Sequence, residues 1–267
     1  MSEDPTPTES AFLQDYRKEV HPKPSVTTDL VVFTVVDVDL KVLLIRRAQH
    51  PFQGYWALPG GFVSVGNAYE DQGEDLESAA FRELGEETGL EREVLIQNRV
   101  HLEQLYTFGD AYRDPRTRVI TVAYLALVPP QLVPLVRAGS DAAEAQWFSV
   151  WEIERVLEGR MDTAEIHLTG RTGSLVLAFD HAKILRLAID RVRAKIDYTP
   201  IAFSLVPPTF TVSEIRAVYE AVKGSTFDLG NFRRKFKRML ADHIIEEAPG
   251  KRLSRSGPAA KVYRFRS

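Results

Sequence analysis

The sequence predicts an α+β protein in two parts: an α/β/α sandwich built on a mixed sheet, and a small C-terminal unit of two helices and a β-hairpin. Runs of β-branched and apolar residues alternate with amphipathic segments in the first part, which is typical of a sheet covered by helices. A proline-rich segment at 199–210 separates this part from a strongly basic end. With 267 residues, 44% of them hydrophobic, the chain can bury a full core.

The predicted elements follow in order along the chain. Residues 1–28 are expected to form an N-terminal tail with a short helix at Ala11–Val20, and residues 29–198 are expected to form the sandwich. Its strands are predicted at Asp29–Val36, Leu40–Arg46, Leu102–Phe108, Arg118–Leu127 and Ala145–Ser149. Its helices are predicted at Leu76–Thr88, Val150–Glu158 and Ser174–Ile196.

Composition excludes several classes of chemistry. The chain has no cysteine, so disulfides, thiolate metal sites and cysteine nucleophiles are excluded. Its six histidines are scattered and form no zinc-binding pair. The most apolar run, 30–45, is interrupted by charged residues, and the acidic start lacks the features of a secretory signal. We therefore expect a cytoplasmic protein that does not enter membranes.

The segment RELGEETGL at 82–90 places three glutamates on one helix. At 100° per residue, Glu83 and Glu87 lie about 40° apart around the axis, and Glu86 lies about 60° from Glu83. Like charges at this spacing repel, whereas Mg²⁺ favours such oxygen ligands and leaves room for water and phosphate. The alternative is a solvated acidic helix face. The strand, Pro-Gly-Gly break and loop before this helix favour the metal site.

These residues resemble the Nudix box, in which a glutamate, seven residues and REUxEExGU (U apolar) form a loop, a helix and a loop. Glu74 and the segment at 82–90 match this pattern. The family hydrolyses nucleoside diphosphates linked to another group, with Mg²⁺ or Mn²⁺. The resemblance implies that Glu83, Glu86 and Glu87 hold the metal. It also implies that Glu86 assists or acts as the base, and that Arg82 anchors a carboxylate, which makes these four the candidate catalytic residues.

The chain departs from the box in the loop before the helix, which we call the box loop. Twelve residues separate Gly61 from Glu74, where the box has five, and Ala68 takes the position of the usual glycine. The box loop is therefore about seven residues longer than usual. Gly85 inside the helix is also unfavourable, by about 1 kcal/mol relative to alanine. The carboxylates are retained, whereas the course of the box loop does not follow from the pattern.

Residues 211–267 form the second predicted unit. They contain 13 Lys and Arg against six Asp and Glu, a net charge of +7, whereas the rest of the chain has 21 against 31, or −10. Thr211 and Glu214 fit a capping box that begins one helix, Gly224 ends it, and Asp228 caps a second, basic helix. With the basic hairpin that follows, they predict a winged helix-turn-helix. The buried side of the second helix is expected to consist of Leu229, Phe232, Phe236, Met239 and Leu240.

Positive charge concentrated on one helix and one hairpin favours a polyanionic partner, and backbone phosphates would supply most of the affinity. The alternative, a solvated basic helix with a stray hairpin, does not account for this concentration. Asn231, Arg234 and Arg238 are expected to face base edges. The candidate contacts to double-stranded DNA are Asn231, Arg233, Arg234, Lys235, Lys237, Arg238, Lys251, Arg252 and Arg255.

Three stretches extend the resemblance over nearly the whole chain from about Asp29: WALPGGFV at 56–63, LEQLYTFGDAYRDPRTRVITVAYLAL at 102–127, and the basic end. Together they are similar to the Nudix-related transcriptional regulators, the NrtR family. The resemblance implies a dimeric bacterial repressor of NAD-metabolism genes that leaves DNA when its Nudix domain binds ADP-ribose or a related NAD-derived nucleotide. Hydrolysis is retained in some members. The expected ligand contacts are Arg47, Gly60, Gly61, Tyr106, Arg113, Arg116 and Arg118, although the loop 106–118 is also a candidate for the dimer interface.

Two alternatives stay open at this point. One is a plain Mg²⁺-dependent ADP-ribose pyrophosphatase whose basic unit stabilises a dimer or binds an acidic partner. It predicts robust production of AMP and ribose 5-phosphate, with no sequence-selective binding of DNA. The other is an RNA-processing protein whose basic unit holds RNA 5′ ends. Comparing the affinity of the protein for single-stranded RNA with its affinity for duplex DNA at matched salt distinguishes this hypothesis from the repressor.

Overall fold

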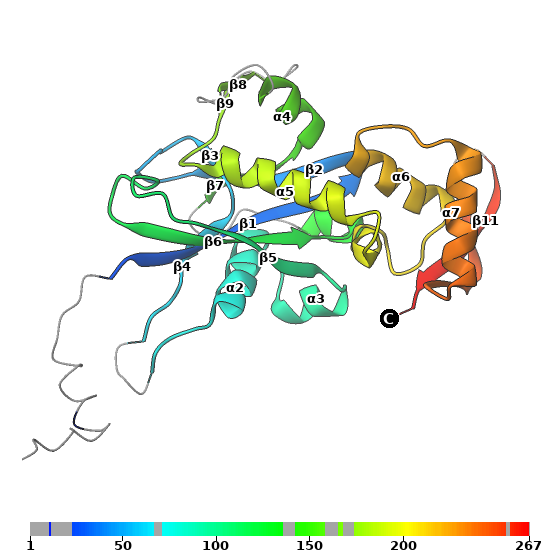
Figure 1. Ribbon diagram of the computed structural model, residues 1–267, viewed down its shortest axis with the longest axis horizontal. Helices are drawn as coiled ribbons and strands as arrows, with labels where there is room; N and C mark the ends of the chain where they lie inside the picture. Colours follow the sequence, from blue (N-terminus) through cyan, green and yellow to red (C-terminus); the bar gives the residue numbers. More distant parts are fainter. Residues whose placement is uncertain are drawn as a thin grey trace, which may run out of the picture.

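The computed structural model of the chain describes residues 11, 23–66, 71–135, 142–157, 165–167, 174–254 and 257–266 (Figure 1). The predicted helix Ala11–Val20 lies, apart from its first residue, outside these ranges. The strands of the larger part are β1 (Ser25–Val36), β2 (Asp39–Arg47), β3 (Trp56–Ala57), β4 (Gly60–Phe62), β5 (His101–Phe108), β6 (Val119–Leu127), β7 (Ala142–Ser149), β8 (Glu165–His167) and β9 (Ser174–Val176). Its helices are α2 (Leu76–Thr88), α3 (Arg92–Gln97), the 3₁₀ helix η1 (Pro130–Leu135), α4 (Val150–Leu157) and α5 (His181–Lys195).

Seven strands form one mixed sheet with the central order β3-β2-β1-β6-β5. β1 pairs parallel with β6 along its length and antiparallel with two other strands. The first half of β1 pairs with β4, where Asp29 lies opposite Gly60, and the second half pairs with β2, where Phe33 lies opposite Val42. Because β2 and β4 leave β1 at different points, the sheet splits between them. A cavity lies at this split.

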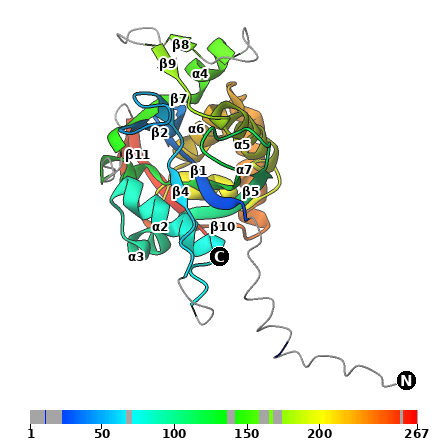
Figure 2. The ribbon, with the colours of Figure 1, turned by 90° about the vertical axis from the view of Figure 1, so that its left-hand side faces the viewer.

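The sheet has helices on both faces, which confirms the predicted sandwich (Figure 2). Successive residues of a strand point to opposite faces. Leu30 and Val32 of β1 accordingly pack in the cluster that contains residues of α2 and α3, whereas Val31 and Phe33 pack in the cluster that contains residues of α4 and α5. All four side chains are fully buried. Because the strand is buried on both faces, its sequence is a continuous apolar run rather than an alternating one.

The structure confirms the five predicted strands, and β1 extends the first of them back to Ser25. Helix α2 has the predicted bounds, because Asp75 caps its first turn and Gly89 ends it in the left-handed conformation at φ 69°. The predicted helix Ser174–Ile196 is wrong in its first third. Ser174–Val176 forms β9 instead, and α5 begins only at His181.

The reason for this error lies in the pattern of burial. Leu175 and Leu177 alternate into the core as strand residues do. Phe179 then adopts a left-handed φ of 51°, which no helix interior allows. Asp180 follows as the residue before the first helical position of α5. A run of apolar residues this short fits a strand or a helix equally well, so its periodicity did not decide between them.

The C-terminal unit contains α6 (Val212–Lys223), α7 (Leu229–Ala241) and a hairpin of β10 (Ile245–Ser254) and β11 (Gly257–Phe265), as predicted for a winged helix. The capping box is formed: the backbone N–H of Glu214 donates to Thr211 Oγ1 at 3.2 Å, and that of Thr211 donates to Glu214 Oε2 at 2.7 Å. Phe232, Phe236 and Met239 are buried as expected. Leu229 is 55% exposed, so its predicted burial was wrong, and Leu240 is half-buried.

The connection between the two units is packed rather than loose. It contains the 3₁₀ helix η2 (Pro200–Leu205), whose Ile201 and Ala202 are buried. Phe210 exchanges two backbone hydrogen bonds with Tyr263 of β11, at 2.8 and 2.7 Å. One apolar cluster runs from the sheet through this connection into α6 and α7. The division at 199–210 itself remains a prediction. Among the described residues, no helix is long and apolar enough to cross a membrane.

Candidate functional site

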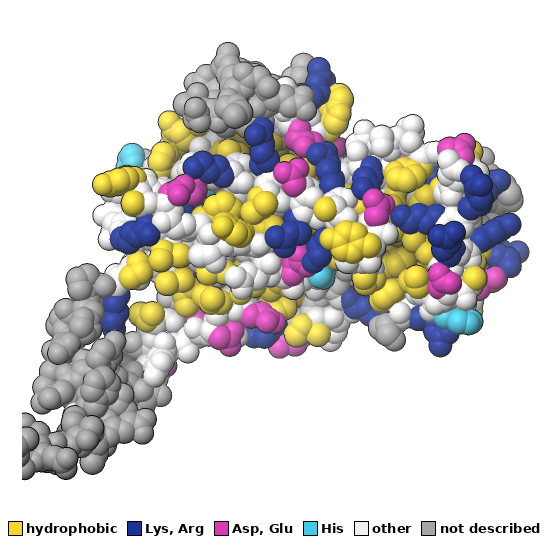
Figure 3. Space-filling view, in the orientation of Figure 1, with side chains coloured by type: hydrophobic (Ala, Val, Ile, Leu, Met, Phe, Trp, Pro, Cys, Tyr) yellow, Lys and Arg dark blue, Asp and Glu magenta, His cyan; other side chains and the backbone are white. Residues whose placement is uncertain are grey.

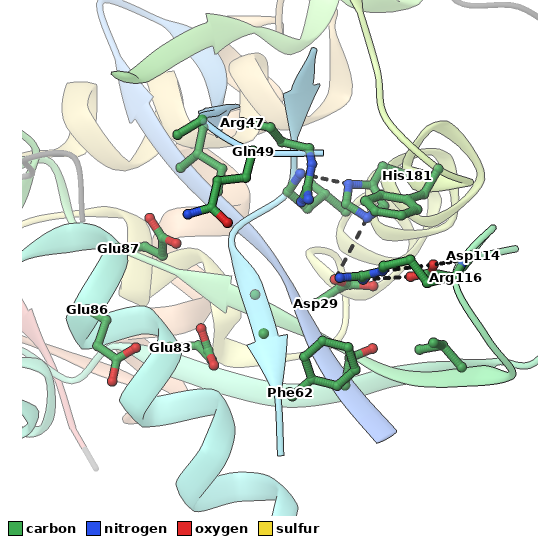
Figure 4. A pocket seen from close by; sticks show the side chains of 18 of the residues that line it. Asp29, Arg47, Gln49, Phe62, Glu83, Glu86, Glu87, Asp114, Arg116 and His181 are labelled. Carbon is green, nitrogen blue, oxygen red and sulfur yellow. Dashed lines mark hydrogen bonds and ion pairs between the residues drawn. The ribbon is translucent and has the colours of Figure 1, made fainter. Parts of the chain in front are cut away.

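A cavity of 350 Å³ opens where the sheet splits between β2 and β4. One wall is the glutamate face of α2, and the opposite wall comes from the end of β2, the loop 109–118 and the start of α5 (Figure 4). The residues that line it are Thr27, Asp29, Ile45, Arg47, Ala48, Gln49, His50, Leu58, Gly60, Gly61, Phe62, Arg82, Glu83, Glu86, Glu87, Arg113, Asp114, Arg116, Val119, Phe179 and His181.

The acidic wall is held in place by Arg82. Its guanidinium binds both carboxylate oxygens of Glu74, at 2.6 and 3.1 Å, and donates to Glu83 Oε1 at 2.8 Å. It also reaches Glu86 Oε2 at 3.3 Å. The hydrogen bond from Arg82 lowers the pKa of Glu74 to about 2, so this carboxylate is charged at neutral pH. Arg82 therefore anchors a carboxylate, as the resemblance implied.

The box loop keeps this geometry despite its extra length. The backbone N–H of Ser64 donates to Glu74 Oε1 at 2.8 Å, and that of Glu74 donates to Ser64 O at 3.1 Å. These two bonds close the loop at its base. Gly61 lies against the buried Glu83: a Cβ at this glycine would lie 2.4 Å from Glu83 Oε1. Glycine here allows the close approach of the Glu83 carboxylate and is not required by an unusual φ.

The three glutamates fit a divalent cation in chemistry, because their only ligand atoms are carboxylate oxygens and all three line the cavity. Glu83 and Glu87 are each 6% exposed, and Glu86 is exposed to solvent. Burial raises the pKa of Glu83 in spite of the hydrogen bond from Arg82, so a cation beside it would be stabilising. Within the ranges that the structure describes, however, no three acidic or histidine side chains converge on one point. The donor atoms match the ion, and Arg82 holds two of the three carboxylates, those of Glu83 and Glu86.

The opposite wall is basic and aromatic. Arg47 donates from Nε to Pro51 O at 2.8 Å and lies over the ring of Phe179 at 5.0 Å. Arg116 binds Asp114 with two hydrogen bonds, at 3.0 and 2.7 Å, and lies over the ring of Phe62 at 5.2 Å. Burial and the charge of Arg116 lower the pKa of Arg47. Two guanidinium groups that face one cavity favour an anion between them.

The floor of the cavity is a buried ionic cluster that sequence reasoning did not find. Arg113 donates to Asp180 at 2.6 and 3.1 Å and to Asp29 at 3.2 Å. His181 Nδ1 accepts from the backbone N–H of Leu58 at 2.9 Å, and its Nε2 lies 3.8 Å from Asp29 Oδ1. Burial lowers the pKa of His181, so the ring is neutral. No local signal joins these residues, because Arg113 and Asp180 are 67 positions apart.

The structure divides the predicted ligand contacts into two groups. Arg47, Gly60, Gly61, Arg113 and Arg116 line the cavity, and the guanidinium of Arg113 is already enclosed by carboxylates. The other two do not line it. The Tyr106 ring is 58% exposed on β5 and packs edge-on against Phe108, and Arg118 donates to Gly109 O at 2.7 Å, which ties down the loop. Gln49, Phe62, Phe179 and His181 line the cavity although the sequence did not single them out.

The basic helix α7 presents most of its charge to solvent at one end of the molecule (Figure 3). With Phe232, Phe236 and Met239 buried, Arg234 lies on the opposite face, about 140–160° around the axis from each of them. Its guanidinium bonds to Asn231 Oδ1, one turn earlier. Asn231, Arg233, Lys237 and Arg238 are also exposed.

Lys235 differs from its neighbours on α7. Its ammonium lies 4.0 Å from the centre of the Tyr219 ring and 3.3 Å from Asp197 Oδ1, in the segment that follows α5. In the hairpin, Lys251 is exposed, and Arg252 binds Glu214 at 2.6 Å and Thr209 O at 2.9 Å. Arg255 lies outside the described residues. Lys235 and Arg252 thus hold structure together in this conformation.

Comparison with known proteins agrees with both halves of this description. The NUDIX domain model matches residues 27–168, and the model of the NrtR DNA-binding winged helix domain matches residues 202–265. The "ADPR responsive transcriptional repressor NtrR" of Acinetobacter baylyi is 34% identical over 97% of this chain and 88% of its own length. The ADP-ribose pyrophosphatase of Methanocaldococcus jannaschii is 33% identical over 65% of this chain and 77% of its own.

Solved structures of Shewanella oneidensis NrtR are also similar. The complex with a 27mer DNA superposes with a TM-score of 0.68 at 30% identity, covering 90% of this chain and 93% of the other. The complex of its Nudix domain with ADP ribose gives a TM-score of 0.50 at 29% identity, covering 69% of this chain and 99% of that domain. The match to the DNA complex thus spans nearly the whole of both chains. The chain therefore belongs to the NrtR family, in which a Nudix domain is followed by the NrtR DNA-binding winged helix domain.

Proposed function

We propose that the chain is a DNA-binding transcriptional repressor of NAD-metabolism genes, and that ADP-ribose or a related NAD-derived nucleotide binding to its Nudix domain releases the DNA. The observation that carries this proposal is the presence, in one packed chain, of a cavity with opposed acidic and basic walls and of an exposed basic helix on a winged helix unit. The ADPR-responsive repressor and the DNA-bound relative match nearly the whole chain, and the relative bound to ADP-ribose matches its Nudix domain.

The walls of the cavity suit the parts of such a nucleotide. The diphosphate is assigned to the space that Arg47 and Arg116 face, since guanidinium groups pair with phosphate oxygens in a two-pronged geometry. The rings of Phe62 and Phe179 offer flat apolar surfaces for the nucleoside. Glu83, Glu86 and Glu87 would hold Mg²⁺ or Mn²⁺, which supplies charge neutralisation beside the diphosphate when bound.

A homodimer follows from the DNA side of the proposal. A single α7 reads one half-site, and two copies related by a two-fold axis would place two such helices on successive turns of a duplex. In that arrangement Arg234 and Arg238 lie nearest the DNA, with Lys251 of the hairpin contacting the backbone.

A mobility-shift assay tests the proposal. Duplexes enriched by this protein from a random-sequence pool are titrated with the protein, with and without ADP-ribose and Mg²⁺. We expect a sequence-selective complex that ADP-ribose dissociates, whereas AMP at the same concentration has a weaker effect. A complex that ADP-ribose leaves intact refutes the role of effector, and failure to enrich any sequence refutes the repressor.

Hydrolysis of ADP-ribose is a second candidate activity, favoured by the three glutamates that line the same cavity. It predicts Mg²⁺-dependent formation of AMP and ribose 5-phosphate that Glu83→Gln or Glu87→Gln abolishes. Both variants keep the shape of the side chain. If the rate of the wild-type protein equals that of the variants, the cavity only senses the nucleotide.

A further inference from the structure

Helix α5 joins the nucleotide cavity to the DNA-binding unit. Fifteen residues long, it spans about 22 Å at 1.5 Å per residue. It lies across the sheet with its first residue at the cavity and its C-terminal end beside α6 (Figure 1). The two proposed activities of the chain are therefore connected by one straight element.

The first end of α5 is built from residues that line the cavity. His181 is its first residue, and Phe179 lies just before it, under the guanidinium of Arg47. Asp180 is held by Arg113, which also binds Asp29 of β1. A ligand that moves Arg47 or Asp29 therefore acts directly on the start of the helix.

The middle of α5 is tightly packed, so a displacement of its first turn would involve the whole helix. Ile184, Leu185, Ala188, Ile189 and Val192 are all buried, in the cluster that continues into α6 and α7. Packed interiors respond to a displacement by moving as a unit or by adopting a second arrangement.

The C-terminal end of α5 is hydrogen-bonded to the DNA-binding unit. Arg193 binds Glu154 of α4 at 2.6 and 2.7 Å, and its Nε donates to Val222 O of α6 at 3.0 Å. In return, Lys223 of α6 donates to Arg193 O at 2.9 Å. A side chain of each unit thus donates to a backbone carbonyl of the other, so two hydrogen bonds join the C-terminal ends of α5 and α6.

Three charged residues complete this contact, and we call them the α5 latch: Asp197, Lys223 and Lys235. Asp197 Oδ2 lies 2.6 Å from Lys223 Nζ, and Oδ1 lies 3.3 Å from Lys235 Nζ of the DNA-binding helix α7. Although burial acts in the opposite direction, the hydrogen bonds from both lysines lower the pKa of Asp197. One carboxylate therefore connects the end of α5 to both helices of the winged helix unit.

We propose that the α5 latch holds the winged helix unit in its DNA-binding orientation, and that nucleotide binding displaces α5 and opens the latch. This inference rests on the proposed function and assigns its regulation to three residues that do not line the nucleotide cavity. A ligand shifts such an equilibrium only through different affinities for its two arrangements. The latch stabilises the nucleotide-free arrangement, so weakening it makes the nucleotide-bound arrangement easier to reach.

The variant Asp197→Asn tests the proposal, with Asp190→Asn as its matched control. Asp190 is exposed on α5, so the control removes the same charge from the same helix without touching the latch. Calorimetry measures the affinity of each DNA-free protein for ADP-ribose, and the mobility shift measures the ADP-ribose concentration that releases half of the enriched duplex. Thermal unfolding checks that each variant folds.

For Asp197→Asn we expect tighter binding of ADP-ribose and a releasing concentration lower by roughly twofold to fivefold, the size expected for partly exposed ion pairs. The control stays at the wild-type values. A misfolded variant would bind ADP-ribose more weakly, so tighter binding distinguishes an opened latch from damage. Lys223→Gln should act in the same direction, and adding it to Asp197→Asn should have little further effect.

Two results overturn the proposal. If Asp197→Asn does not tighten the binding of ADP-ribose and does not lower the releasing concentration, the latch does not set the equilibrium. If Asp190→Asn reproduces the effect, charge rather than the latch is responsible. A wild-type complex that ADP-ribose does not dissociate is a different result, because it refutes the proposed function itself.

Discussion

The contact between Gly61 and Glu83 gives a sharp test of how the acidic wall is built. In Gly61→Ala, the new Cβ would lie 2.4, 2.8 and 2.9 Å from Glu83 Oε1, Cδ and Oε2. An ordinary carbon–oxygen contact is about 3.3–3.6 Å, so the carboxylate must retreat by about 1 Å. The backbone of Gly61 does not need a positive φ, and alanine therefore adds only this steric clash.

The expected magnitude follows from the bond that is lost. A retreat of about 1 Å stretches the 2.8 Å bond between Arg82 and Glu83 beyond hydrogen-bonding range. A hydrogen bond to a charged group contributes about 1.5–3 kcal/mol. Because Arg82 is 32% exposed and keeps Glu74, we take about 1 kcal/mol, a fall in Tm of about 2–4 °C. Affinity for ADP-ribose in the presence of Mg²⁺ should fall about tenfold, since Glu83 is a candidate metal ligand.

Calorimetric titration with ADP-ribose, with and without Mg²⁺, measures this effect, and thermal unfolding measures the stability. Gly109→Ala is the control, because the nearest atom to its added Cβ is 4.0 Å away. We expect the loss in Gly61→Ala to be large with Mg²⁺ and small in its absence. Wild-type Tm and wild-type Mg²⁺ dependence in this variant would refute the claim that glycine is required to seat Glu83.

Three further outcomes follow from the contacts described. Glu74→Gln should lower the free energy of unfolding by about 1–2 kcal/mol at neutral pH. Because Arg82 lowers the pKa of Glu74 from 4.5 to about 2, this stability is present above pH 4.5 and is lost as the pH falls toward 2. Urea unfolding at a series of pH values should therefore show the stabilities of the two proteins converging in acid. Val38→Gly should raise Tm by about 2–4 °C, since a β-branched residue at φ 60° is strained. Arg234→Ala should reduce the slope of log affinity for DNA against log salt by about one, whereas Lys235→Gln should leave it unchanged because its ammonium is held by the latch; equal slopes for both variants would contradict this assignment.

Local signals in the sequence predicted the elements whose ends are marked by capping residues. Helix α2 has the predicted bounds because Gly89 ends it, and α6 begins at a capping box that Thr211 and Glu214 form as expected. The long strands were also predictable, because each has enough residues to show an apolar or alternating pattern. The short strands β3, β4, β8 and β9, each of two or three residues, carry too few positions for a pattern, and they were missed or assigned to a helix.

The candidate site was predictable to the extent that one segment contributes it. The three glutamates of α2 come from a single helix, and spacing alone places them on one side. The floor of the cavity is different, because Asp29, Arg113 and His181 come from three distant segments that only the fold brings together. The charge of Arg113 suggested a ligand contact, whereas its two carboxylate partners show that it fixes the start of α5.

The same reasoning explains why the DNA-binding residues could be predicted as a group but not one by one. A run of five basic residues between 233 and 238 indicates a polyanion whichever way the helix turns. Which of them are available depends on what the helix packs against, and Lys235 faces Asp197 and Tyr219 rather than open solvent.

Continuity of the core across the two units constrains how a nucleotide can act on DNA binding. A flexible tether would let the winged helix unit keep its affinity for DNA whatever the cavity contained. Here the connection buries Ile201 and Ala202, and one apolar cluster includes residues of the sheet, α5, α6 and α7. The unit cannot reorient without changing that packing and the polar contacts at the end of α5. Differential stabilisation of two packed arrangements, rather than release of a tethered domain, is therefore the form of regulation that this fold supports.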